Sequence, residues 1–347
     1  MKTFIPLPSV QRGDKVAILS PSAGLPGLFP WVHELGLARI RDDFGLVPVE
    51  YPTTRQMGST PADRARDIMA AFADPDIKAV IASIGGNDQI RVLPYLDAAL
   101  LRANPKPFFG YSDNTHLHHF LWKLGIPSCY GGGVLTQYAM QGQMDAMTRR
   151  ALEHALFHRG DYVLEASDYY NDEGLPWDNP DNLGKTRKHE ANDGHYWDGD
   201  ADAAGVLWGG CVESLVLQMS AGIYLPGDDE LDGAILFLET SEGIPAHWII
   251  KYLLTGMGER GWLAKFRAVL VGRPQAWSFA NPQSAEEKAK YRAAQRDAVI
   301  ETVRRYNAHI PIVQNLDFGH TDPQVPLPLG GLARLEGKAR RIILHYA

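Results

Sequence analysis

The sequence predicts an α/β protein with two domains. The chain has 347 residues, about twice the length of an ordinary single domain. Short β-branched runs alternate with helical patterns, and 34 glycines and 23 prolines supply many turns between them. Hydrophobic residues make up 45% of the chain and charged residues 22%, which is typical of a globular protein with a substantial core. We therefore expect parallel sheets covered by helices.

In the first half of the chain, strand and helix patterns alternate. The apolar run at 15–20 is typical of a buried strand, and Gly45 ends the helical pattern that follows it. Thr60 and Pro61 supply a hydroxyl cap and an early proline for the next helix. The pattern predicts strands at 15–20, 78–86 and 107–112 and helices at 31–45, 59–74 and 113–125.

Residues 165–204 form a polar, turn-rich segment that also contains Tyr169, Tyr170, Trp177 and Trp197. A long segment without regular structure is usually a linker or a functional loop, and the aromatic residues argue against a plain linker. We expect a substrate loop here, between an N-terminal domain at 1–164 and a C-terminal domain at 205–347. In the C-terminal domain the pattern predicts strands at 203–210, 233–239, 268–272 and 311–315, a strand pair within 332–345, and helices at 211–222, 246–258 and 284–305.

Composition excludes several classes of function. Lys and Arg number 34 against 41 Asp and Glu, a net charge of −7, and no basic run occurs, so a nucleic-acid polymer is not an expected partner. Two cysteines, Cys129 and Cys211, cannot form a disulfide framework, which favours the reducing cytoplasm. The N-terminus does not resemble a signal peptide, and no apolar stretch is long enough for a membrane span.

Two motifs suggest a cofactor or metal but lack the necessary context. Gly256, Gly258 and Gly261 match a dinucleotide-binding pattern, yet they follow a helical pattern instead of a strand. His116 and His119 share a helix face, but no third metal ligand lies nearby, which favours packing histidines. We expect neither a cofactor nor a metal.

Ser112 is the candidate nucleophile. It ends an apolar strand and precedes a predicted helix, so it would lie at the carboxyl edge of the sheet, where open α/β sheets place their sites. The N–H of Asp113, at the helix start, could stabilise an oxyanion. Asn114 replaces the last glycine of a GxSxG elbow. From these residues alone a nucleophile and an N-cap remain equally open roles for Ser112.

Gly85, Gly86 and Asn87 end the strand predicted before Ser112. Glycines permit close approach of the backbone to a ligand, so this turn could supply a second oxyanion donor, although a simple tight turn would look the same.

An acid and an imidazole follow strands of the second half. Glu239 ends the apolar run 233–239, and burial there requires a partner such as a histidine N–H. His320 lies just past strand 311–315, in a loop rich in glycine and proline, although the default expectation for any one of twelve histidines is a structural role. A general base must be neutral, so activity should fall on acidification through a pKa near about 6.5.

Three segments together, at 110–115, 236–242 and 317–322, resemble in order and spacing the serine peptidase family of LD-carboxypeptidases and microcin C immunity proteins. The resemblance covers nearly the whole chain. It implies an N-terminal flavodoxin-like or glutamine-amidotransferase-like domain, a smaller C-terminal α/β domain, and an active site at their interface. It also implies a homodimer without metal or cofactor.

The resemblance assigns roles to individual residues. It implies Ser112 as nucleophile, His320 as base and Glu239 as the group that orients the imidazole, with the N–H groups of Asp113 and Gly86 as the oxyanion hole. One position departs from the family: Cys211 stands where a Gly-Gly-Asn sequence is common, which puts a side-chain role at that position in doubt.

The substrate remains open between two branches of the family. The longer aromatic loop and the sequence 239–242 favour the immunity branch, which cleaves the amide between an aspartyl group and a modified nucleotide. The alternative is a murein tetrapeptide, and a third possibility is a silent ligand-binding protein. Trp177 would stack on an adenine or pack within its loop. Asn87 and Glu242 are further candidates for substrate contact, although Glu242 could equally face solvent.

Overall fold

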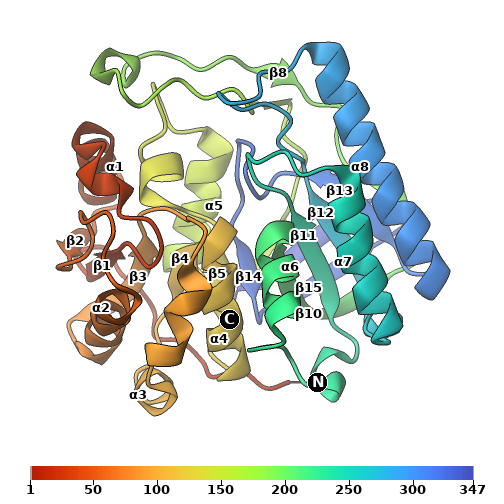
Figure 1. Cartoon of the computed structure of the whole chain (residues 1–347), viewed down its shortest axis with the longest axis horizontal. Coiled ribbons are helices and arrows are strands. Elements are labelled where there is room, and N and C mark those ends of the chain that lie inside the picture. The colour runs from red at the N-terminus through yellow and green to blue at the C-terminus, as the bar shows by residue number, and fades with distance from the viewer. Residues whose placement is uncertain (1, 347) are drawn as a thin grey trace.

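A six-stranded sheet forms the first half of the molecule in the computed structural model, which describes residues 2–346 (Figure 1). All neighbouring strands in it are parallel except the edge pair of β14 and β5. In order across the sheet the strands are β14 (Leu327–Leu329), β5 (Ser128–Tyr130), β4 (Phe108–Gly110), β3 (Ile77–Ala82), β1 (Lys15–Leu19) and β2 (Val47–Glu50).

Helices cover both faces of this sheet. Val16 and Ile18 of β1 belong to one apolar cluster and Ala17 and Leu19 to another, as the alternation of a strand requires. Helices α1 (Pro30–Asp42) and α5 (Ala146–Phe157) contribute to the first cluster, and α2 (Pro61–Ala73), α3 (Ala98–Ala103) and α4 (Thr115–Lys123) mainly to the second. The predicted α/β class is confirmed.

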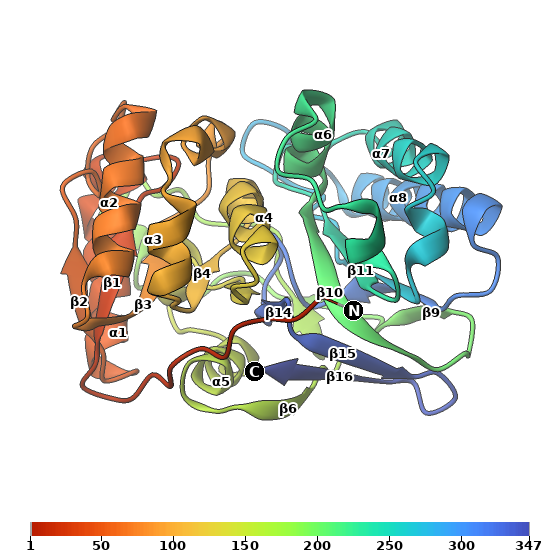
Figure 2. The same cartoon turned by 90° about the horizontal axis from the view of Figure 1, so that it is seen from below.

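The second half contains an eight-stranded mixed sheet. Strands β10 to β13 are parallel, and the outer strands pair antiparallel. Figure 2 shows β15, β16 and β6 curling below β10, next to α5. In order the strands are β6 (Gly160–Val163), β16 (Arg341–Tyr346), β15 (Leu332–Glu336), β10 (Ala203–Cys211), β11 (Ile235–Glu239), β12 (Ala268–Gly272), β13 (Ile312–Leu316) and β9 (Tyr196–Asp198).

Helices α6 (Val212–Ala221), α7 (His247–Glu259) and α8 (Ala285–Tyr306) pack on this sheet. Gly256 and Gly258 lie inside α7, so the helical context expected for them is confirmed. A Cβ atom on Gly258 would collide with the ring of Tyr306 on α8, which gives that glycine a packing role. Among residues 2–346, no helix has both the length and the apolar character of a membrane span.

The two halves exchange strands. β6 comes before residue 164 in the chain but pairs with β16 in the second sheet, and β14 comes from the C-terminal half but pairs with β5 in the first. The loop predicted at 165–204 contains β9, which pairs with β13, and the short ribbon of β7 (Tyr169–Tyr170) and β8 (Glu190–Ala191). The predicted boundaries at residues 164 and 205 therefore do not separate the two sheets completely, because each sheet contains a strand from the other half of the chain.

Two of the three histidines of α4, His118 and His119, are packing groups. His118 bonds through Nε2 to the Gly110 carbonyl at 2.8 Å, and His119 bonds through Nε2 to the Gly209 carbonyl at 2.9 Å. Burial lowers the pKa of His118 to about 3 and that of His119 to about 4, so both are neutral at physiological pH. These contacts support the packing interpretation from the sequence.

Candidate active site

Ser112 lies at a strained turn between β4 and α4. Its φ is 64°, and residues Ser112–Asn114 form a 3-10 turn that runs into the helix. A positive φ is uncommon for a residue with a side chain, and such strain is concentrated at functional sites. The N-cap positions of the two helical segments are Tyr111 and Asn114, neither of which makes a side-chain cap hydrogen bond, so Ser112 does not occupy the N-cap position that the sequence left open.

The turn at residues 85–86 comes close to Ser112 because it is built of glycines. A Cβ atom on Gly85 would lie 2.9 Å from Ser112 Cβ and 3.0 Å from its Oγ. A Cβ atom on Gly86 would collide with Ser22 Oγ. A larger residue at position 85 would push the turn away from Ser112, and one at position 86 would push it away from Ser22. The close approach of this backbone to a ligand, which the sequence suggested, stays a prediction.

The Asp113 carboxylate holds this turn in place. Its Oδ2 accepts hydrogen bonds from Ser22 Oγ at 2.5 Å, from Asp88 N at 3.0 Å and from Gln89 N at 2.9 Å. The main-chain N–H of Asp113 belongs to the first turn of a helix, where N–H groups lack partners within the helix. Its side chain therefore organises the turn, while its N–H lies next to Ser112.

Glu239 and His320 form a buried pair. Glu239 ends β11 and is 1% exposed, and its Oε2 accepts a hydrogen bond from His320 Nδ1 at 2.5 Å. A carboxylate can only accept, so Nδ1 carries the proton. Gly319 makes this approach possible, since a Cβ atom there would lie 2.7 Å from Glu239 Oε2. The other oxygen, Oε1, accepts a hydrogen bond from the Tyr130 hydroxyl at 2.6 Å.

Ser112 and His320 line one cavity, which has a volume of about 570 Å³. Its walls also include the turn at 85–86, the loop residues 171–178 and Arg187, and the segment 275–279. The volume is in the range of small-molecule sites, about 300–1,000 Å³. The cavity thus lies where side chains of both halves meet.

Glu242 faces the second ring nitrogen of His320. Its Oε2 lies 3.3 Å from His320 Nε2, and its side chain is 64% exposed while it also lines the cavity. The sequence left open whether Glu242 contacts a ligand or faces solvent, and its position is compatible with both. Nε2 is the nitrogen that a general base would turn toward a serine, and in this structure its contact is with Glu242.

Acidic neighbours raise the pKa of His320. Burial by itself lowers this pKa, but the charge and hydrogen bond of Glu239 and the charges of Glu242 and Glu213 outweigh it and raise the pKa of His320 to about 9. The sequence predicts the ordinary pKa of a histidine for His320. No local pattern predicts the shift, because the tertiary fold brings the three carboxylates close to the ring.

The remaining residues considered from the sequence differ in whether they line the cavity. Trp177 lines the cavity and packs edge-to-face on Phe29 with ring centroids 5.6 Å apart, so both of its expected roles remain compatible with the structure. Asn87 is exposed and, within the described chain, lies outside the residues that line the cavity. Cys211 is buried, with its Sγ 3.2 Å from Glu213 Oε2, and is likewise outside that lining.

An ion pair in the cavity wall was not expected from the sequence. Arg187 Nη1 donates to Asp322 Oδ2 at 2.5 Å, and its Nη2 lies 3.5 Å from Asp145 Oδ2. Asp322 follows His320 by two residues, so this pair attaches the 165–204 loop to the segment that carries the imidazole. The sequence signal was the arginine in that polar loop, but nothing local identifies its partners.

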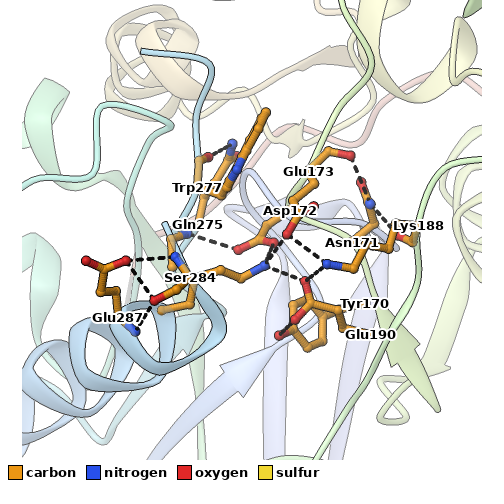
Figure 3. A network of polar contacts seen from close by, with 12 residues as sticks. Tyr170, Asn171, Asp172, Glu173, Lys188, Glu190, Gln275, Trp277, Ser284 and Glu287 are labelled. Carbon is orange, nitrogen blue, oxygen red and sulfur yellow. Dashed lines mark hydrogen bonds and ion pairs between the residues drawn. The ribbon is translucent and has the colours of Figure 1, made fainter. Parts of the chain in front are cut away.

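Three acids of the loop meet at α8. Carboxylate oxygens of Asp172, Glu173 and Glu190 lie within 4.8 Å of one another, a spacing that could suit a metal ion. Lys288 Nζ lies 2.7 Å from Asp172 and 2.9 Å from Glu173 and also pairs with Glu190. Arg292 pairs with Asp172 and Lys188 with Glu173, so three cations together balance the three carboxylates. Figure 3 shows the acids converging between the loop and α8. We interpret this cluster as a fastening of the loop.

Comparison with known families matches most of the chain. Residues 16–131 match the LD-carboxypeptidase N-terminal domain, and residues 204–335 match the LD-carboxypeptidase C-terminal domain.

Individual relatives match three quarters or more of the chain. A putative carboxypeptidase from Treponema pallidum is 29% identical over 356 residues, covering 97% of this chain and 94% of its own length. The microcin C7 self-immunity protein MccF from Escherichia coli is 25% identical over 271 residues, covering 77% of this chain and 74% of its own. The crystal structure of a MccF-like protein from Streptococcus pneumoniae in complex with AMP has a TM-score of 0.85 and 28% identity, covering 96% of this chain and 99% of that chain.

We expect Glu242→Gln to lower the pKa of His320 from about 9 toward 6.5, because a nearby negative charge that stabilises the imidazolium is removed. NMR titration of the His320 ring measures this shift. Glu286→Gln, which changes a carboxylate that is 79% exposed on α8, is the matched control and should leave the pKa of His320 unchanged. An unshifted pKa in Glu242→Gln would contradict the contact between Glu242 and the imidazole.

Proposed function

Because the chain belongs to the LD-carboxypeptidase family of serine hydrolases, we propose that it hydrolyses an amide bond in a small peptidyl or aspartyl-nucleotide substrate, with Ser112 as the nucleophile. His320 is the general base and then the general acid, and Glu239 orients it. The observation that carries the proposal is the single cavity lined by Ser112 and His320, with the imidazole held from behind by a buried carboxylate.

The proposed reaction has two steps. In the first, once Glu242 has turned away and the His320 ring is neutral, Ser112 Oγ attacks the amide carbonyl carbon while His320 Nε2 takes the hydroxyl proton, and the N–H groups of Asp113 and Gly86 stabilise the oxyanion. The imidazolium then gives that proton to the leaving nitrogen as the carbon–nitrogen bond breaks. In the second step His320 takes a proton from water as the water oxygen attacks the acyl-serine carbonyl carbon. His320 then returns that proton to Ser112 Oγ as the bond between the acyl carbon and Oγ breaks, which releases the acid and free Ser112.

Glu242 must leave His320 Nε2 before the first step, and its exposed side chain is free to rotate. We propose that a positively charged group of the substrate receives it. Three other acids line the cavity wall. Asp322 pairs with Arg187 and Asp172 pairs with Lys288, whereas Asp178, like Glu242, has no Lys or Arg partner among residues 2–346. This charge distribution supports a substrate with a free amino group, as in an aminoacyl compound.

We favour the aspartyl-nucleotide substrate over the murein peptide. Trp177 and Phe29 give the cavity an aromatic wall on which an adenine could stack. The MccF-like protein with 28% identity was crystallised with AMP, which supports a nucleotide ligand for this chain as well. The murein tetrapeptide remains the second candidate, because the matching family is that of the LD-carboxypeptidases.

The test is incubation of the protein with aspartyl sulfamoyl adenosine and, separately, with a murein tetrapeptide, with products followed by mass spectrometry. We expect aspartate and sulfamoyl adenosine from the first compound. Ser112→Ala should reduce turnover by about 10⁴-fold or more while its circular dichroism stays native, because no other group replaces the nucleophile.

Each other outcome has a clear meaning. Release of D-alanine from the tetrapeptide alone would favour the second candidate. Cleavage of neither compound would favour a ligand-binding protein without this activity, and undiminished turnover by Ser112→Ala would remove the assignment of the nucleophile.

A second test addresses the aromatic wall. If Trp177 stacks on the base, Trp177→Ala should raise KM for the nucleotide substrate by about 5- to 150-fold with little change in kcat, since base stacking contributes about 1–3 kcal/mol. Trp248→Ala, which removes an indole that is 48% exposed on α7, is the matched control. A lower melting temperature of Trp177→Ala with unchanged KM would show instead that the indole only packs within its loop.

A further inference from the structure

Tyr130 occupies a junction between the two halves of the candidate site. It ends β5, and its register partner on β4 is Gly110, two residues before Ser112. The ring is fully buried. Its hydroxyl lies 3.0 Å from the main-chain nitrogen of Ser112 and 2.6 Å from Glu239 Oε1. One oxygen atom therefore contacts both the serine of the first half and the carboxylate of the second.

The direction of both hydrogen bonds follows from chemistry. A main-chain N–H can only donate and a carboxylate can only accept, so the phenol accepts from Ser112 and donates to Glu239. Burial, followed by the charge of Glu239, raises the pKa of Tyr130 well above its ordinary value, so the hydroxyl keeps its proton at physiological pH. The Tyr130 hydroxyl thus both donates and accepts a hydrogen bond inside the site.

We propose that the Tyr130 hydroxyl is a positioning group for the reaction, one that fixes the Ser112 main chain and the Glu239 carboxylate relative to each other. The inference rests on the proposed function of Ser112. It deepens that function by adding a residue that touches neither the substrate nor the reacting atoms.

Two features of the site need such a group. Ser112 has a positive φ, which costs free energy unless neighbouring contacts hold it, and its N–H is held by Tyr130. The Glu239 carboxylate could otherwise rotate about its last bond, but Tyr130 on Oε1 and His320 on Oε2 hold it from both sides. The imidazole is therefore directed by a carboxylate whose orientation is itself fixed from β5.

The hydroxyl can be removed without removing the ring. Tyr130 packs edge-to-face on Phe237 with centroids 5.1 Å apart, and phenylalanine keeps that contact. Tyr138 provides a matched control, because it is equally buried and its hydroxyl has no hydrogen-bond partner among residues 2–346. Tyr138→Phe thus removes a buried hydroxyl without removing a hydrogen bond to any of residues 2–346.

The experiment uses a fluorophosphonate, which reacts with an activated serine and does not require the natural substrate. We expect the probe to modify Ser112 of the wild-type protein, located by peptide mass spectrometry. Tyr130→Phe should lower the limiting rate of modification by about 10- to 100-fold, the range for a lost hydrogen bond to a charged group, with little change in the probe concentration for half-maximal rate. Tyr138→Phe should react at nearly the wild-type rate.

The possible outcomes distinguish failure of the positioning role of Tyr130 from failure of the proposed role of Ser112 as nucleophile. Modification of wild-type Ser112 together with equal limiting rates in wild type and Tyr130→Phe would overturn the positioning role alone. Failure of the wild-type protein to react at Ser112 would overturn the proposed nucleophile and the positioning role with it. A purely structural role of Tyr130 would lower the melting temperature without lowering the limiting rate at a temperature where the variant is folded.

Hydrogen–deuterium exchange of the wild-type protein provides a measurement that does not depend on the folding of Tyr130→Phe. The hydrogen bond to Tyr130 should protect the Ser112 amide from exchange. Exchange of this amide at the rate of an unstructured peptide would contradict the hydrogen bond from the Ser112 N–H to Tyr130, on which the inference depends.

Discussion

The buried charge of Glu239 is the constraint on which the candidate site depends. An isolated carboxylate at this depth would cost several kcal/mol, so its two oxygens require partners. One partner, His320, follows β13 of the same sheet, and the other, Tyr130, ends β5 of the opposite sheet. The charge is therefore satisfied only when the two halves are docked, and the strand exchange of β6 and β14 holds them in that arrangement.

The same docking creates the cavity and fixes its wall. Arg187 and Asp322 attach the 165–204 loop to the segment that carries His320, and Lys288 attaches the loop to α8 through three carboxylates. Both clusters bury cations that are paired, so opening the loop would expose or unpair charges. The polar, turn-rich loop 165–204 is thus held in place as part of the cavity wall. Glu242 differs from these paired groups, because its side chain is exposed and lies next to the imidazole.

The sequence predicted the features that local patterns encode. Long apolar runs identified β1, β3, β11 and β12, and the strand-to-helix turn drew attention to Ser112. Strands β5 and β14 have three residues each, too few to show a period, yet β5 carries Tyr130. Helix α5 was also missed, although its buried residues Thr148, Ala151 and Leu152 have helical spacing. The contacts of Tyr130 and Glu242 join distant segments, so no local pattern could reveal them or the raised pKa of His320.

In the proposed reaction, Ser112, His320 and the N–H groups of Asp113 and Gly86 act on one carbonyl group. A crystal structure of the wild-type protein with an aminoacyl boronic acid tests it most directly, since boron adds to an activated serine as a tetrahedral mimic of the intermediate. We predict a bond from Ser112 Oγ to boron, one boronate oxygen about 2.7–3.1 Å from both N–H groups, and Glu242 displaced from His320 Nε2. Boronate bound away from Ser112, or Glu242 still paired with Nε2 in the adduct, would contradict it.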